Sequence, residues 1–105
     1  MGAFGFEGLE VYKLAVGVAR WVRTVRWPAR TTSLRDQAER ASQSVVLNIA
    51  EGWSRSDGNR RVLLQAALGS AGEVLAVLDI VALPGGDEQQ QVLRRIGAML
   101  ARSAR

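Results

Sequence analysis

Apolar residues recur along most of this chain at intervals of three and four, the period of an α-helix, and no stretch alternates with the period of a strand. Two prolines, Pro28 and Pro84, interrupt this pattern, and the glycine- and serine-containing stretch EGWSRSDGN at 51–59 interrupts it again. The interruptions divide the chain into four helical segments. We expect one domain over residues 1–105, with helices at about 8–27, 33–52, 57–83 and 87–103.

The first segment is apolar over a wide part of its circumference, roughly 220° when successive residues are placed about 100° apart. The polar strip that remains is narrow: Glu10, Lys13, Gly17, Arg20 and Thr24. Three sister helices cover only part of such a surface, so the pattern predicts burial against another copy of the chain. The residues expected at that interface are Val11, Leu14, Val18, Trp21 and Val25.

The third segment carries a second apolar flank beside its main apolar face. This flank consists of Val62, Ala66, Val77 and Ile80. The small-residue run AALGSAG at 66–72 allows a neighbouring backbone to approach closely. Two apolar flanks indicate that this helix packs against two neighbours. The fourth segment has one apolar stripe with arginines on the opposite side, as in an ordinary bundle helix.

A line of polar residues runs along the edge of the apolar face of the second segment. If the second and third segments form an antiparallel hairpin, Arg40 comes level with Glu73, and Glu51 with Arg60 or Arg61. We expect a structural polar network, and a cost on the order of 3 kcal/mol for leaving a buried ion unpaired. Its members are Gln37, Arg40, Ser44, Asn48, Glu51, Ser70 and Glu73. The alternative, acid/base catalysis by Glu51 and Glu73, is disfavoured because each has an expected arginine partner.

Composition removes several kinds of chemistry. The chain has no cysteine and no histidine, which excludes disulfides, thiolate or imidazole metal sites, cysteine nucleophiles and Ser-His triads. No dense carboxylate cluster offers a metal site, and no motif implies a cofactor. The N-terminal stretch does not have the pattern of a signal peptide, so we expect a cytoplasmic protein. The net charge is +4, carried almost entirely by arginine, which suits phosphate contacts.

Residues 9–81 resemble a family of bacterial four-helix bundle proteins encoded by intervening sequences of 23S rRNA genes. Four motifs in register carry the resemblance: a Leu-x-Val-Tyr-x-x-Ala opening, then Leu-Arg-x-Gln, Ser-x-x-x-Asn-Ile-x-Glu-Gly and Gly-Ser-x-x-Glu. They comprise Leu9, Val11, Tyr12 and Ala15; Leu34, Arg35 and Gln37; Ser44, Asn48, Ile49, Glu51 and Gly52; and Gly69, Ser70 and Glu73.

The resemblance implies an all-α, antiparallel up-down-up-down left-handed four-helix bundle that assembles as a ring, commonly a homopentamer. It also implies kinship with the accessory protein of diversity-generating retroelements, a basic bundle that binds a reverse transcriptase and nucleic acid. The family has no established catalytic activity. The chain departs from the pattern at the start of the third helix, where VLLQAAL replaces a phenylalanine-rich stretch, and in its short fourth helix.

We therefore expect a non-catalytic homo-oligomer whose basic surface binds RNA, DNA or a nucleic-acid enzyme such as a reverse transcriptase, since guanidinium groups contact phosphates and indoles stack on unpaired bases. The candidate contacts are Arg20, Arg23, Arg26 and Arg30 near Trp27, and Arg55, Arg60 and Arg61 near Trp53. The alternative is that both tryptophans only anchor loops, and that the arginines only solvate the bundle or pair with aspartate and glutamate. A protein-protein scaffold is the main alternative. An enzyme and a membrane-associated first helix are weaker ones, and we expect no membrane partner.

Overall fold

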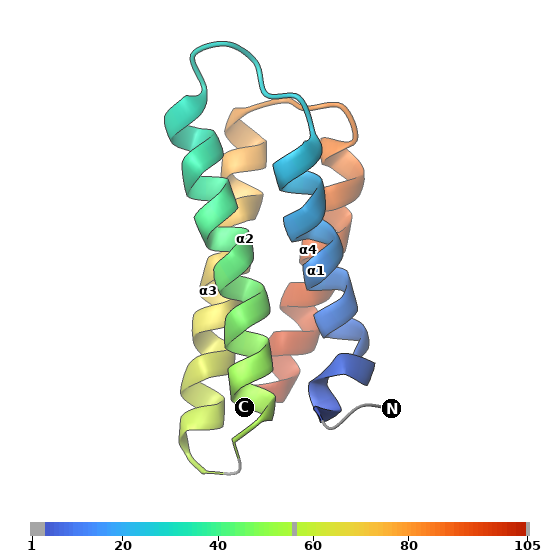
Figure 1. Ribbon diagram of the computed structural model, residues 1–105, viewed down its shortest axis with the longest axis vertical. Coiled ribbons are helices and arrows are strands. Elements are labelled where there is room, and N and C mark those ends of the chain that lie inside the picture. The colour runs from blue at the N-terminus through green and yellow to red at the C-terminus, as the bar shows by residue number, and fades with distance from the viewer. Residues whose placement is uncertain (1–3, 56, 105) are drawn as a thin grey trace.

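The computed structural model describes residues 4–55 and 57–104, which form a short 3-10 helix followed by four α-helices. Their bounds are η1 Gly5–Gly8, α1 Glu10–Thr24, α2 Thr32–Trp53, α3 Asn59–Ile80 and α4 Gly86–Ser103. The four α-helices run alternately up and down the long axis of the molecule, so that η1 and the end of α4 lie at the same end (Figure 1). The predicted antiparallel four-helix bundle is confirmed, and the described residues form no strand.

The core lies along the axis of the bundle, and all four helices contribute to it. The most extensive contact is the antiparallel hairpin of α2 and α3, and each of these helices also packs against a further neighbour. The largest side chains that are completely enclosed come from different helices: Val22, Ile49, Leu64, Val74, Ile96 and Leu100. The apolar period read from the sequence therefore marks the buried face of every helix.

Helix α1 ends at Thr24, three residues before the predicted end. Val25 is extended, with φ −68° and ψ 148°, and the indole N–H of Trp27 donates to the Val22 carbonyl at 3.1 Å. This hydrogen bond uses one of the carbonyls that the end of a helix leaves without a partner in the helix. Trp27 thereby fixes the loop onto α1, and the residue before Pro28 avoids the helical conformation that proline disfavours.

Helix α3 is shorter than predicted at both ends. It starts at Asn59, because the side chain of Asp57 accepts a hydrogen bond from the Asn59 N–H at 3.0 Å and forms a turn before the helix. It ends at Ile80, because Val81 is extended and buried beneath the bundle end. Gly85, with φ +80°, then directs the chain into α4.

Much of the wide apolar surface of α1 is covered within the chain, which corrects part of the interface predicted there. Val11 and Val18 are buried in the core, and Leu14, Trp21 and Val25 are partly buried against it. The prediction counted three sister helices but omitted the connecting segments, which add cover at both ends of α1. Phe6 of η1 packs edge-on against Tyr12, and the α3–α4 turn lies against the Trp21 indole.

The exposed large apolar side chains of the α-helices lie on α2 and α3, and Phe4, before η1, is exposed as well. Leu47, Val62 and Ile80 are 66%, 61% and 68% exposed. Among the described helices, α3 alone is long and apolar enough to cross a membrane by length and composition, and only 33% of its most apolar window is buried. The second flank predicted on this helix is thus real, except that Val77 belongs to the core.

Candidate functional site

The polar line on α2 contributes one small hydrogen-bonded cluster between α2 and α3. The Asn48 amide donates to the Ser44 carbonyl and hydroxyl, both at 2.9 Å, and the Ser70 hydroxyl donates to that of Ser44, also at 2.9 Å. All three residues are partly buried. The cluster therefore fixes the register of the hairpin, since a one-turn slip of either helix would separate Ser44 from Ser70.

The remaining four residues of the predicted network do not join this cluster. Glu51 pairs with Arg55, one turn further along the chain, at 3.1 Å, and with neither of the predicted partners, Arg60 or Arg61. Gln37, Arg40 and Glu73 are exposed, and no Arg40–Glu73 ion pair forms. The predicted pairings were wrong because these charged groups lie on the outer side of the hairpin, where water solvates them. The predicted cost on the order of 3 kcal/mol, which applies to buried ions, does not hold at Glu51, whose side chain is 53% exposed.

The candidate arginines separate into two groups at opposite ends of a bundle about 44 Å long. Arg20 and Arg23 lie on the second half of α1, and Arg26 and Arg30 follow in the α1–α2 loop; we call these four the arginine end. Arg55, Arg60 and Arg61 lie at the α2–α3 loop, at the other end (Figure 1). A single chain therefore does not present the seven residues as one surface.

The group at the α2–α3 loop is largely occupied by structural contacts. Arg60 donates to the carbonyls of Gly52 and Trp53, at 3.1 and 3.2 Å, and its guanidinium lies 6.0 Å from the Trp53 ring centroid. Arg55 contacts both Glu51 and Asp57. Arg60 therefore caps the C-terminal end of α2, where the backbone carbonyls lack helical partners.

Replacing Arg60 by alanine is expected to lower the free energy of unfolding by about 1 kcal/mol, because two carbonyls lose a charged donor at the surface. Urea titration followed by circular dichroism measures the change. Arg61→Ala, which removes an exposed arginine at the neighbouring position, is the matched control and should change the free energy by less than about 0.5 kcal/mol. Equal effects of the two substitutions would contradict the capping role.

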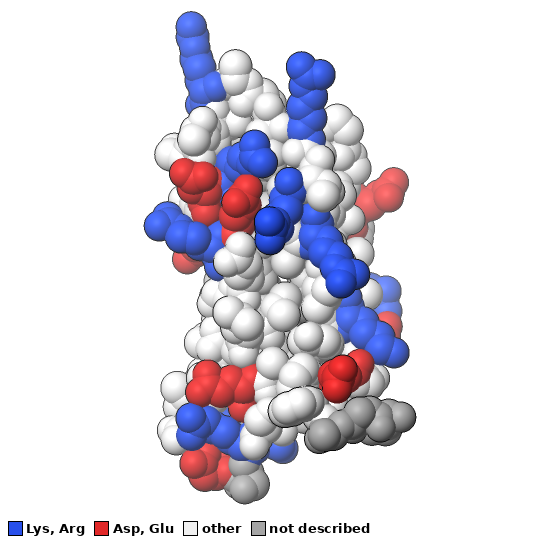
Figure 2. Space-filling model, in the orientation of Figure 1, with Lys and Arg blue, Asp and Glu red and all other residues white. Residues whose placement is uncertain are grey.

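The arginine end is free of acidic partners. Among the described residues, Arg20, Arg23, Arg26 and Arg30 make no ion pair. Figure 2 shows basic side chains following α1 across one face of the molecule, beside an uncharged area in the middle of that face. Trp27 is partly buried, and its indole N–H is bonded to the backbone. It anchors the loop and does not project as a stacking platform.

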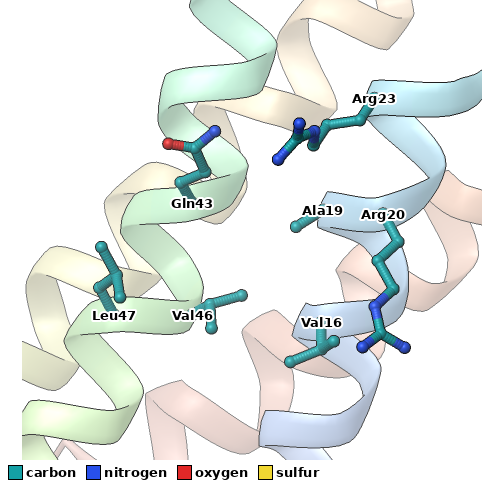
Figure 3. Close-up of a pocket in the computed structure, with 7 residues that line it drawn as sticks. All are labelled: Val16, Ala19, Arg20, Arg23, Gln43, Val46 and Leu47. Carbon is teal, nitrogen blue, oxygen red and sulfur yellow. The ribbon is translucent and has the colours of Figure 1, made fainter.

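Beside the arginine end lies an open groove between α1 and α2, with a volume of about 330 Å³. Its floor is apolar. Arg20 and Arg23 lie on the α1 side, where Arg20 extends down along the helix beside Val16, and Gln43 of α2 lies opposite Arg23 (Figure 3). The guanidinium of Arg23 extends across the upper part of the groove toward Gln43. We call this the α1/α2 groove; its lining is Val16, Ala19, Arg20, Arg23, Gln43, Val46 and Leu47.

The apolar residues of the groove floor, Val16, Ala19, Val46 and Leu47, were not predicted from the sequence as part of a site. The position of Leu47 could have indicated the groove. It lies about 200° around the helix from the buried Ile49, so its side chain is directed away from the core. Val46 is partly buried beside it. No group of three or more carboxylates among the described residues is arranged to hold a metal ion.

The sequence model of the family described as 23S rRNA-intervening sequence protein matches residues 7–95, most of the chain. This chain belongs to that family. Searches of curated proteins and of solved structures give no match. The match includes the end of η1, the first three α-helices and about half of α4, so it covers the whole α2–α3 hairpin and the α1/α2 groove.

The family motif at the end of α2 is explained largely by packing. Ile49 is completely buried, Asn48 bonds Ser44, and Gly52 lies directly against α3. A Cβ atom at Gly52 would lie 3.0 Å from Cδ2 of Leu64, tighter than nine in ten real Cβ contacts. Glu51 is the exception, because it points to solvent. The motif therefore specifies how α2 and α3 pack. Residues that bind a partner must be sought elsewhere on the surface.

Proposed function

We propose that this protein is a non-catalytic module that associates with copies of itself and binds nucleic acid, RNA or DNA, through the arginine end. The observation that carries the proposal is the placement of Arg20, Arg23, Arg26 and Arg30 on the second half of α1 and in the loop that follows it, exposed and without acidic partners among the described residues. Unpaired guanidinium groups lose little by contacting phosphates, and each contact releases counterions.

Self-association adds to this proposal in two ways. Copies of a small basic module multiply the number of phosphate contacts, so weak individual contacts combine into useful affinity. The uncovered apolar surface of α2 and α3 supports association. The family resemblance favours a ring, commonly of five subunits, in the cytoplasm of a bacterium. A nucleic-acid enzyme such as a reverse transcriptase is a further partner compatible with this role.

Nucleic-acid binding is expected to weaken steeply with salt, with a slope of log K against log salt concentration of about −0.7 to −0.9 per phosphate contacted. Fluorescence anisotropy with labelled RNA and DNA oligonucleotides, single-stranded and duplex, measures this slope. The double substitution Arg26→Ala with Arg30→Ala should reduce its magnitude by about two for each copy that contacts the oligonucleotide, because each such copy loses two phosphate contacts.

The matched control is Arg94→Ala with Arg102→Ala, which removes the same charge from exposed positions on α4. If the control reduces binding as much as the loop variant, the interaction follows net charge and the assignment to the arginine end is wrong. If the wild-type protein binds no oligonucleotide at low salt, the second candidate function applies. That function is a protein-protein scaffold, favoured by the exposed apolar surface of α3.

A further inference from the structure

Six outward-facing residues of α3 are spaced by four, three, four, three and four positions. This is the heptad spacing that keeps side chains on one side of a helix facing a partner helix. All six are exposed. We call them the α3 seam: Val62, Ala66, Gly69, Glu73, Ala76 and Ile80.

The α3 seam is shaped for close contact with another helix. It includes two of the four large apolar side chains that are most exposed among the described residues, Val62 and Ile80, one at each end. Between them the side chains are mostly small, and a Cβ atom built at Gly69 or Gly72 would have no neighbour within 4 Å. A monomer rarely leaves an apolar strip of this kind uncovered.

We propose that the α3 seam of one copy of this chain docks in the α1/α2 groove of a second copy. The inference rests on the self-association in the proposed function and names the two surfaces that carry it. The seam and the groove lie on different parts of the bundle, so the contact is head-to-tail: each copy presents its seam to one neighbour and its groove to the next. Repeated contacts of this kind generate rings when the rotation closes.

Charge favours the groove over a second seam as the docking partner. Glu73 is the one charged residue of the seam, and the groove is lined by Arg20 and Arg23 and by no carboxylate. Two seams paired antiparallel would align Glu73 with Gly69 of the other copy, which places the two glutamates about 6 Å apart along the axis. Like charges meet in that arrangement, and opposite charges meet in the groove.

The heights of the two surfaces along the bundle also agree. The hydrogen bond between Ser70 and Ser44 shows that these two residues lie at the same height along the bundle. Glu73 lies three residues after Ser70, which is about 4.5 Å further along α3. Gln43, next to Ser44, faces Arg23 across the groove (Figure 3). If neighbouring copies are related by rotation about an axis parallel to the bundle, each residue keeps the same height in every copy. Glu73 of one copy then lies within one helical turn, in height, of Arg23 of the next.

This arrangement divides the arginine end between two tasks. Arg20 and Arg23 contact the neighbouring copy, while Arg26 and Arg30, which do not line the groove, remain available to phosphates. A membrane is the other environment that could cover an apolar α3. It is disfavoured because the hairpin partner α2 carries exposed charges at Arg40 and Glu51, which a spanning hairpin would bury.

A charge exchange tests the contact. Glu73→Arg is expected to raise the dissociation constant between copies by about tenfold or more, measured by light scattering over a concentration series, because it faces Arg20 and Arg23. Arg20→Glu with Arg23→Glu should do the same, and combining all three substitutions should restore association. Glu88→Arg, at an exposed acidic position on α4, is the control and should leave association unchanged.

Disulfide crosslinking tests the geometry, since the chain has no cysteine of its own. The double variant Ala19→Cys with Gly69→Cys places one thiol in the groove and one in the seam. Mild oxidation should produce a ladder of covalent oligomers on a denaturing gel, whose highest rung counts the subunits. Each single variant alone should remain largely uncrosslinked. Circular dichroism of the double variant and of both single variants would check that they are folded.

Three outcomes would overturn the proposal. Dimers from Gly69→Cys alone would show that seams meet each other. A wild-type protein that stays monomeric at high micromolar concentration, or that partitions into phosphatidylcholine vesicles, would show that the seam has another partner or none. Failure of nucleic-acid binding is a separate result, because it is measured with oligonucleotides, whereas association is measured on the protein alone. Arg26→Ala with Arg30→Ala should weaken oligonucleotide binding and leave association unchanged.

Discussion

Replacing Ile49 by alanine is expected to lower the free energy of unfolding by about 2–5 kcal/mol, a large part of the stability of a small domain. The Ile49 side chain is completely buried between α2 and the rest of the core, so its removal leaves a cavity that the surrounding side chains fill only in part. Urea denaturation at one fixed protein concentration measures the change, since self-association would make stability depend on concentration.

Glu51→Ala, two residues away on the same helix, is the informative comparison. Its carboxylate is half exposed and makes a single i,i+4 pair with Arg55, so the expected loss is about 0.5 kcal/mol or less. A loss near 3 kcal/mol would instead show that Glu51 is buried in the assembled protein. The pair of variants therefore separates the packing role of the family motif from its one exposed charge.

Replacing Gly52 by valine is expected to lower the free energy of unfolding by about 1–3 kcal/mol, through overpacking of the hairpin. The new Cβ would lie 3.0 Å from Cδ2 of Leu64, which is itself completely buried, and 3.5 Å from Cβ of Leu63. Leu64 cannot move away without displacing other core side chains. The effect should therefore exceed the gain in helix propensity that replacing a glycine brings.

Gly17→Val provides the matched control within α1. A Cβ atom at Gly17 meets nothing within 4 Å, and the residue is exposed, so we expect a change within about 0.5 kcal/mol. Thermal or urea unfolding of both variants makes the comparison. Equal stability of the two valine variants would mean that α2 and α3 do not meet as closely at Gly52 as the structure shows.

The sequence determined much of the fold because local patterns carry it. The period of apolar residues placed the buried face of each helix, and Pro28, Pro84 and the 51–59 stretch located the three connections. The ends of α1 and α3 were missed by two or three residues. Those ends depend on specific contacts, the indole of Trp27 on Val22 and the side chain of Asp57 on Asn59, which periodicity does not contain.

The candidate surfaces could be predicted only in part. The four residues of the arginine end were named from the sequence, and the structure places them together because α1 leads directly into its following loop. The predicted links of Arg40 to Glu73 and of Glu51 to Arg60 or Arg61 did not form. Two residues at the same height along a hairpin can still point to water and not toward each other. The α1/α2 groove joins residues from two helices and has no continuous trace in the sequence.

By itself, the sequence determined that this protein is a four-helix bundle of its family, without the residues for thiol or imidazole chemistry. Only the tertiary structure decided which apolar surface is left uncovered. The sequence favoured α1, most of whose apolar side chains are enclosed by η1, the connecting turns and the other helices except along the α1/α2 groove, whereas the most exposed large apolar side chains of the four α-helices lie on α2 and α3. The physical reason is that the apolar width of a helix depends on its own residues, while its burial depends on every segment that packs against it.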